Sequence, residues 1–221
     1  MNNIKAVVFD MDGLMIDTER LWVESVLEAG KQLNYQIEEN YIITIAGLRK
    51  DLYDAKLQQY LGEVCDIAKV REVANNIFAG KFDKGELKPK KGVKELISYL
   101  KEKGLILAIA SSSEKSEVIH RLQLVGIKAE FFDNIIGGDM VKKAKPDPEI
   151  YEMSCQVLGI EPKFVLALED SEFGVEAAGR AGLVPIHIPD LKPSTEHSRK
   201  YAYKTFENLF EVIDLFENKK D

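Results

Sequence analysis

Cysteine is scarce in this sequence of 221 residues: only Cys65 and Cys155 occur, and neither belongs to a CxxC or a Cys/His cluster. A disulfide framework and a thiolate zinc site therefore have no support. Long hydrophobic runs are lacking too, because only about five apolar residues precede Asp10 and no run approaches the roughly 18 residues of a membrane span. From these absences we expect a cytoplasmic protein with no membrane partner.

An excess of positive charge is also missing. The sequence has 30 Lys and Arg against 37 Asp and Glu, a formal net charge of -7. Proteins that bind nucleic acids need a basic surface to displace counterions from phosphates, so we expect no nucleic-acid partner. A small anionic substrate is still compatible, because a few cations can reverse the field within one cleft. With 45% apolar residues the chain can bury a substantial core, and we expect a monomer that folds alone.

Short apolar runs that end at polar residues predict a buried parallel sheet of about five strands. Their apolarity is continuous rather than alternating, which is typical of strands covered by helices on both faces. Amphipathic segments lie between them, and each ends at a glycine, a helix C-terminal signal. The expected strands are 6–9, 105–110, 134–136, 164–168 and 184–188, and the expected helices are 93–103, 115–125, 149–158 and 173–181.

This alternation of strands and helices predicts right-handed βαβ units and a Rossmann-like open parallel α/β sheet. Ligands in such folds bind at the carboxyl ends of the strands. Asp10, Ser111, Glu169 and Asp170 each follow the end of an expected strand. We therefore expect these side chains to converge on one crevice.

One long segment lacks any convincing strand. Between the first two strands the periodicity is helical, with candidate helices at 19–33, 50–61 and 67–82. The sequence thus predicts a core domain formed by residues 1–15 and 88–221 and an inserted small α-helical cap domain at residues 16–87.

Two aspartates separated by one residue follow the first strand. Asp10 and Asp12 would repel each other in a cleft and raise each other's pKa, unless something binds them. A divalent cation relieves this repulsion. With Glu169 and Asp170 from another strand end, the site offers four acidic side chains, and such oxygen ligands suit Mg²⁺.

Each motif taken alone also has a simpler explanation. Asp10 and Asp12 could be turn residues before Gly13, and Glu169-Asp170-Ser171 could cap a helix. The serines 111–113 could be a capping box, and Lys145-Pro146 could begin an exposed turn. Because all four motifs occur in order at successive strand ends, a shared site is the better interpretation.

The sequence resembles the phosphatases of the haloacid dehalogenase superfamily. The resemblance is carried by four segments that look like the motifs of that family, and the helical insertion is similar to the cap of the branch with β-phosphoglucomutase, phosphoglycolate phosphatase and the 2-deoxyglucose-6-phosphate or hexitol-phosphate phosphatases. The segments are DMDGLMIDTE at 10–19, ASSS around Ser111, KPDPEIY at 145–151 and EDSEFGVEAAGRAG at 169–182.

The resemblance implies a role for each motif. It makes Asp10 a nucleophile that forms an aspartyl-phosphate and Asp12 the general acid and base. Ser111, with Ser112 beside it, and Lys145 would bind the transferring phosphoryl group. Mg²⁺ would be held by the Asp10 carboxylate, the Asp12 backbone carbonyl and Asp170, with Glu169 as a further ligand or a partner of the ligands.

Three hypotheses differ in what happens to the phosphoryl group: it passes to water, it passes to a sugar hydroxyl, or it is not transferred. We favour a phosphatase that acts on a small sugar or polyol phosphate, over a β-phosphoglucomutase-type mutase and a catalytically silent phosphometabolite binder. The mutase carries a histidine where this chain has Trp22, and a silent binder has no need of Asp12. Trp22 is either a packing residue of the cap or a platform for a sugar ring. Arg49 is either a surface residue or a ligand for a distal phosphate or sugar oxygen.

Overall fold

The computed structural model describes residues 1, 3–48 and 50–217 of the chain and divides it into two compact units. The first comprises residues 1–16 and 89–221, and the second comprises residues 17–88. Arg49, a predicted substrate residue, lies outside the described residues. The helices that the structure describes include none that is both long and apolar enough to cross a membrane.

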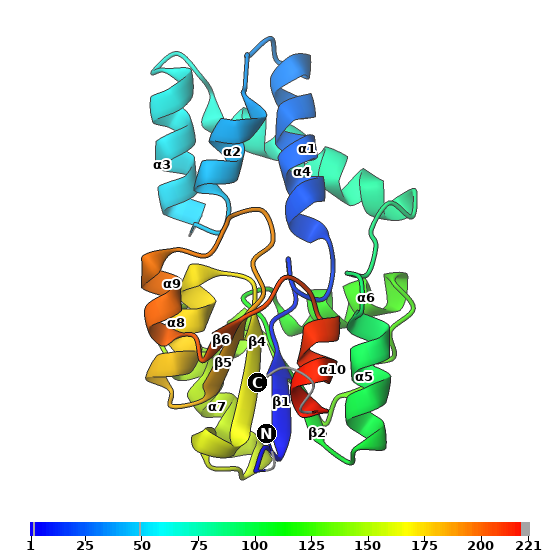
Figure 1. Cartoon of the computed structure of the whole chain (residues 1–221). Coiled ribbons are helices and arrows are strands. Elements are labelled where there is room, and N and C mark those ends of the chain that lie inside the picture. Colours follow the sequence, from blue (N-terminus) through cyan, green and yellow to red (C-terminus); the bar gives the residue numbers. More distant parts are fainter. Residues whose placement is uncertain (2, 49, 218–221) are drawn as a thin grey trace. The chain divides into compact units, whose positions relative to one another are not determined.

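The first unit contains a six-stranded parallel sheet in the order β3-β2-β1-β4-β5-β6 (Figure 1). This confirms the expected open parallel α/β fold. The sixth strand was not predicted, because it has only two residues and no apolar run. The strands are β1 (Ala6–Phe9), β2 (Ile106–Ala110), β3 (Asn134–Ile136), β4 (Val165–Glu169), β5 (Val184–His187) and β6 (Lys204–Thr205).

The strand order reverses between β1 and β4. The chain runs outward from β1 through β2 to β3, then returns to place β4 on the other side of β1. In open α/β sheets the crevice outside the carboxyl ends of the strands at such a point is where ligands bind. Asp10 follows the end of β1, and Glu169 is the last residue of β4.

Helices cover both faces of the sheet. Alternate strand residues such as Ala6 and Val8 pack with α7 and α8 in one buried cluster, while α5 and α10 lie together on the other side (Figure 1). Burial on both faces explains why the strands are apolar without alternation. The helices of this unit are α5 (Val93–Glu102), α6 (Lys115–Leu124), α7 (Glu149–Leu158), α8 (Glu172–Arg180), α9 (Glu196–Tyr201) and α10 (Phe210–Phe216).

The second unit is built of helices alone within the part that the structure describes. Its core lies between α1 and α4, where Leu21, Val26, Val70 and Ala74 are buried. The segment between the first two candidate helices, to which no helix was assigned, contains a short additional helix. The helices are α1 (Thr18–Gln32), α2 (Glu39–Ile45), α3 (Lys50–Leu61) and α4 (Ile67–Asp83).

Candidate active site

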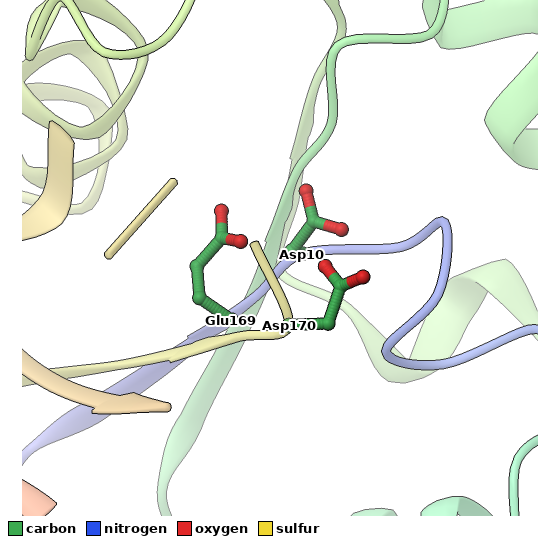
Figure 2. Close-up of side chains that lie close together, drawn as sticks. All are labelled: Asp10, Glu169 and Asp170. Atoms are coloured by element: carbon green, nitrogen blue, oxygen red, sulfur yellow. The ribbon is translucent and has the colours of Figure 1, made fainter. Parts of the chain in front are cut away.

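Three carboxylates gather at the point where the strand order reverses. Phe9 and Leu168 are register partners of the parallel β1–β4 pair, and the backbone N–H of Asp10 donates to the Leu168 carbonyl at 2.9 Å. The next residues of both strands therefore lie side by side. Asp10, Glu169 and Asp170 each offer a carboxylate oxygen within 4.8 Å of the others (Figure 2).

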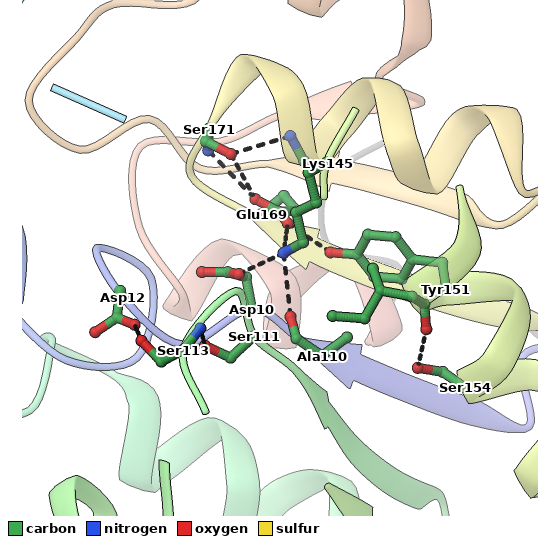
Figure 3. A network of polar contacts seen from close by, with 12 residues as sticks. Asp10, Asp12, Ala110, Ser111, Ser113, Lys145, Tyr151, Ser154, Glu169 and Ser171 are labelled. Atoms are coloured by element: carbon green, nitrogen blue, oxygen red, sulfur yellow. Dashed lines mark hydrogen bonds and ion pairs between the residues drawn. The ribbon is translucent and has the colours of Figure 1, made fainter. Parts of the chain in front are cut away.

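Lys145 connects the two strand ends (Figure 3). Its ammonium donates to Asp10 at 2.5 Å, to Glu169 at 2.6 Å and to the Ala110 carbonyl at 3.1 Å. Burial alone would lower the pKa of Lys145, but the charges of Asp10 and Glu169 outweigh it and hold that pKa well above its ordinary value. Lys145 is therefore a buried cation beside Asp10. The motif does form a turn before α7, as the simpler interpretation predicted, but the Lys145 side chain is not exposed.

Glu169 is surrounded by hydrogen-bond donors. The Tyr151 hydroxyl donates to its Oε1 at 2.5 Å, the atom that Lys145 also contacts, and the Ser171 hydroxyl donates to Oε2 at 3.1 Å. Burial raises the pKa of Tyr151 well above its ordinary value, so its hydroxyl keeps its proton. Both oxygens of Glu169 are thus engaged, which favours Glu169 as a partner of the metal ligands more than as a ligand itself. Ser171 also caps α8, as the simpler interpretation of that motif predicted.

The groups around Asp10 have opposing effects on its charge. Burial raises the pKa of Asp10 well above its ordinary value, the charge of Glu169 raises it further, and Lys145 opposes both effects. Asp10, Glu169 and Asp170 form the acidic cluster, and the Lys145 ammonium contacts the first two of them. A divalent cation would oppose the negative charge of these carboxylates and favour ionised Asp10. The Asp10 and Asp170 carboxylates, with Glu169 beside them, offer the hard oxygen ligands that Mg²⁺ prefers, so the residues present fit this metal.

The serine loop after β2 lies beside the same strand ends. Ser111 is buried, its N–H donates to the Ile136 carbonyl at 3.0 Å, and its hydroxyl accepts from the Ser113 N–H at 3.1 Å. Ser112 is exposed. The capping-box alternative is wrong, because the residue before α6 is Glu114 and its side chain caps nothing. A Cβ at Gly138 would lie 2.3 Å from the Ser112 carbonyl, so this loop packs closely against the chain after β3.

The Asp12 carboxylate lies outside the acidic cluster. Its Oδ2 accepts from the Ser113 hydroxyl at 2.8 Å, and its Oδ1 accepts from the Arg121 guanidinium at 2.8 Å. The two aspartates of the first motif therefore have different partners. Asp10 faces Lys145 and the acidic cluster, whereas Asp12 faces a serine and an arginine.

Three of these contact residues had no role in the sequence prediction. Tyr151 and Ser113 both occur within the quoted motifs, so their positions were visible but their partners were not. Arg121 occurs in an expected helix, and its spacing from Glu117 is typical of an exposed ion pair on a helix surface. Nothing in the sequence distinguishes an arginine on that helix whose side chain reaches the end of β1 from one that points into solvent.

Trp22 lies among aromatic side chains of the helical unit. Its ring centroid is 5.7 Å from that of Phe78 in an edge-to-face arrangement and 6.2 Å from that of Tyr53, and the Arg71 guanidinium carbon lies 5.9 Å from the Trp22 ring centroid. These contacts support a packing role for Trp22 within its own unit. A role as a sugar platform stays a prediction.

Gly174 is required by the position of Glu169. A Cβ at this first-turn position of α8 would lie 2.0 Å from the Glu169 carboxyl carbon, and a buried carboxyl held by three donors cannot move aside. We expect Gly174→Ala to lower the free energy of unfolding by roughly 1–3 kcal/mol and to reduce activity. Chemical denaturation and steady-state kinetics measure the two effects.

Gly80→Ala is the matched control for this substitution. Gly80 lies within α4, and a Cβ there meets nothing within 4 Å. Alanine is a better helix former than glycine, so this variant should gain about 0.5–1 kcal/mol of stability. If Gly174→Ala were equally harmless, the close packing of α8 on Glu169 would be contradicted.

Comparisons with known proteins agree on one family. The model of the family described as haloacid dehalogenase-like hydrolase matches residues 7–188. The chain is 33% identical over 189 residues to the Phosphorylated carbohydrates phosphatase of Thermotoga maritima, covering 83% of this chain and 84% of the relative. It is 30% identical over 191 residues to Hexitol phosphatase B of Escherichia coli K12, covering 84% of each.

Solved structures of similar proteins share the fold over nearly the whole chain. A putative β-phosphoglucomutase from Thermotoga maritima superimposes with a TM-score of 0.81 at 28% identity, covering 97% of this chain and 99% of the other. CbbY from Rhodobacter sphaeroides in complex with phosphate superimposes with a TM-score of 0.75 at 27% identity, covering 95% and 96%.

Proposed function

Because the chain belongs to the haloacid dehalogenase-like hydrolases, we propose that it is a Mg²⁺-dependent phosphatase of small sugar or polyol phosphates. The observation that carries the proposal is the environment of Asp10. This carboxylate is buried at the end of β1, 2.5 Å from the Lys145 ammonium and within the acidic cluster. A nucleophile in such a place can approach a phosphoryl group only where cations offset the repulsion between the two anions.

The reaction proceeds in two steps on this chain's own residues. Asp10 attacks the phosphorus, the bond from phosphorus to the leaving oxygen breaks, and Asp12 gives that oxygen a proton. Water then attacks the aspartyl-phosphate, Asp12 takes a proton from the water, and phosphate leaves as Asp10 is restored. Lys145 and the Ser111 hydroxyl stabilise the charge on the phosphoryl oxygens, while Glu169 and Tyr151 keep Lys145 in place.

Magnesium would be held by the Asp10 and Asp170 carboxylates together with the Asp12 backbone carbonyl, and it supplies charge stabilisation to the phosphoryl group when bound. Glu169 then acts through its contact with Lys145. The Asp12 carboxylate is left for proton transfer, which its separate partners support.

The substrate class rests on the relatives. One is named a phosphatase of phosphorylated carbohydrates and another a hexitol phosphatase. We propose that the helical unit selects the substrate, with Trp22 and Arg49 as its candidate contacts. The test is phosphate release from a panel of hexose, pentose and polyol phosphates. Release from none of them would contradict the proposal and favour a silent binder.

A mutase is the second candidate, because one of the similar structures is described as a putative β-phosphoglucomutase. The tryptophan at position 22 argues against it. Phosphorus NMR of β-glucose 1-phosphate with a trace of the bisphosphate separates the two activities. Inorganic phosphate is the expected product, whereas glucose 6-phosphate without inorganic phosphate would establish the mutase.

Magnesium is expected to stabilise the protein as well as activate it. Binding to the folded state alone raises the unfolding free energy by about 2.7 kcal/mol at a concentration of 100 times Kd, so the melting temperature should rise with Mg²⁺ and fall after EDTA treatment. Asp170→Asn should weaken the rise, because it removes one charged ligand of the cluster. Asp139→Asn, outside the cluster, is the control. An unchanged melting temperature in the wild type would contradict the metal site.

A further inference from the structure

Asp12 is held at both of its carboxylate oxygens. The Ser113 hydroxyl donates to Oδ2 at 2.8 Å, and the Arg121 guanidinium donates to Oδ1 at 2.8 Å. The same Nη1 of Arg121 also donates to the Ser113 hydroxyl oxygen at 2.9 Å, which closes a triangle of three side chains. Each contact has the length of a good hydrogen bond, and those to the carboxylate are of the stronger, charge-assisted kind.

The geometry points to Arg121 as a positioning residue: we propose that Arg121 and Ser113 together fix the orientation in which Asp12 transfers protons. This inference rests on the proposed function, because it needs Asp12 as the acid and base. A carboxylate held at one oxygen can still rotate about its terminal bond, whereas one held at both oxygens cannot. Proton transfer depends on that orientation, and a misplacement of about 1 Å can cost roughly 100-fold in rate.

The contacts of Arg121 join two loops of the site to one helix. Asp12 belongs to the loop after β1, Ser113 to the loop after β2, and Arg121 to the second turn of α6. The Arg121 side chain is 13% exposed and that of Asp12 is 22% exposed, so this ion pair is shielded from water more than ordinary surface pairs are. The third partner, Glu117, contacts Nη2 of Arg121 at 3.3 Å with a side chain that is 51% exposed. Arg121 therefore contacts Asp12 and Ser113 on the side of the site and Glu117 on the side of the solvent.

The test uses two probes that differ in what the leaving oxygen needs. The leaving group of sorbitol 6-phosphate is an alkoxide, which must be protonated as it departs. The leaving group of 4-nitrophenyl phosphate is 4-nitrophenolate, which departs without a proton. The second step needs Asp12 as a base for both probes. With sorbitol 6-phosphate we expect Arg121→Ala to lower kcat by roughly 100-fold with little change in KM. With 4-nitrophenyl phosphate we expect the same variant to release a burst of about one equivalent of nitrophenol, followed by slow turnover.

Two further variants separate positioning from simple structural support. Arg121→Lys keeps a cation and should recover part of the lost rate. In the Asp12→Ala background, Arg121→Ala should change nothing more, because a residue that acts through Asp12 has no effect once Asp12 is gone. Glu117→Gln is the matched control, since it removes the solvent-facing partner of Arg121 and leaves the contact to Asp12; its kinetics should equal those of the wild type.

Several results would overturn the inference. The first is an equal loss of kcat on both probes in Arg121→Ala with no nitrophenol burst, and the second is a rise in KM alone in that variant. The third is a loss of kcat in the Asp12→Ala, Arg121→Ala double variant that equals the combined losses of the two single variants. Thermal melts identify a variant that has lost its fold, and Arg121→Lys then decides the question. If Asp12→Ala itself loses both probes equally and gives no burst, the acid-base role fails and the inference fails with it. Failure confined to Arg121→Ala leaves the proposed function intact.

Discussion

Asp10→Asn is expected to reduce phosphatase activity by about 10⁴-fold or more, because it removes the carboxylate that we propose as the nucleophile. The Asp10 side chain lies at the end of β1 with its oxygen 2.5 Å from Lys145. Neighbouring Glu169 is engaged by three donors, and Asp12 is held by Ser113 and Arg121. The asparagine amide is a poor nucleophile and cannot form the acyl phosphate. Release of phosphate measures the loss.

Loss of activity alone does not distinguish a nucleophile from a metal ligand, so the intermediate must be trapped. Substrate labelled in its phosphoryl group should label the wild-type protein transiently, in a form that hydroxylamine removes. Asp12→Asn is the matched control. It makes the same chemical change two residues away but keeps the nucleophile, so its label should accumulate when the leaving group needs no proton. A label on Asp10→Asn, or activity that survives in it, would contradict the mechanism.

Lys145→Ala is expected to have the second largest effect, on activity and stability together. The Lys145 side chain is 7% exposed and is the cation between the buried carboxylates of Asp10 and Glu169. Removing one partner of a buried ion pair leaves uncompensated charge and typically costs about 3–5 kcal/mol. Because we also propose that Lys145 stabilises the transferring phosphoryl group, kcat should fall by roughly 10³-fold.

Lys143→Ala provides the comparison. Its side chain is 70% exposed and pairs only with Asp147, at 3.4 Å, among the ion pairs of the described part of the chain. Exposed pairs contribute about 0–1 kcal/mol, so both activity and unfolding free energy should stay near wild type. Mg²⁺ should recover part of the stability of Lys145→Ala, since a divalent cation can offset the same carboxylates. If the two lysine substitutions changed kcat and the unfolding free energy equally, the buried contacts of Lys145 would not be important for activity or stability.

The sequence predicts those elements of the fold whose signals lie in adjacent residues, and it misses those that depend on distant contacts. The expected strands, and most helices of the sheet unit, occur where they were predicted, because apolar runs and terminal glycines are properties of adjacent residues. The structure adds α2, α9, α10 and β6, which have two to seven residues each. Segments this short contain too few turns for a helical pattern to be recognised, which takes a window of about 11–18 residues, so packing against neighbours decides their conformation.

The same distinction applies to the site. Apolar runs and the motifs that follow them placed Asp10, Ser111, Glu169 and Asp170 at strand ends, and the parallel sheet brings the carboxylates among them together. Helix 149–158 was also predicted, yet nothing in its pattern indicated that the Tyr151 hydroxyl contacts Glu169. The direction in which a helical side chain points depends on how that helix packs on the sheet.

The sequence by itself therefore determined the family, the fold class and the chemical groups that are available for phosphoryl transfer. Only the tertiary structure decided which groups meet. Lys145 and Asp10 are 135 residues apart, and Arg121 and Asp12 are 109 apart. Such pairs form because the order β2-β1-β4 brings distant strand ends side by side, and because α6 packs where Arg121 reaches the loop after β1. Local patterns in a chain encode its elements, but contacts across a sheet depend on the order of its strands.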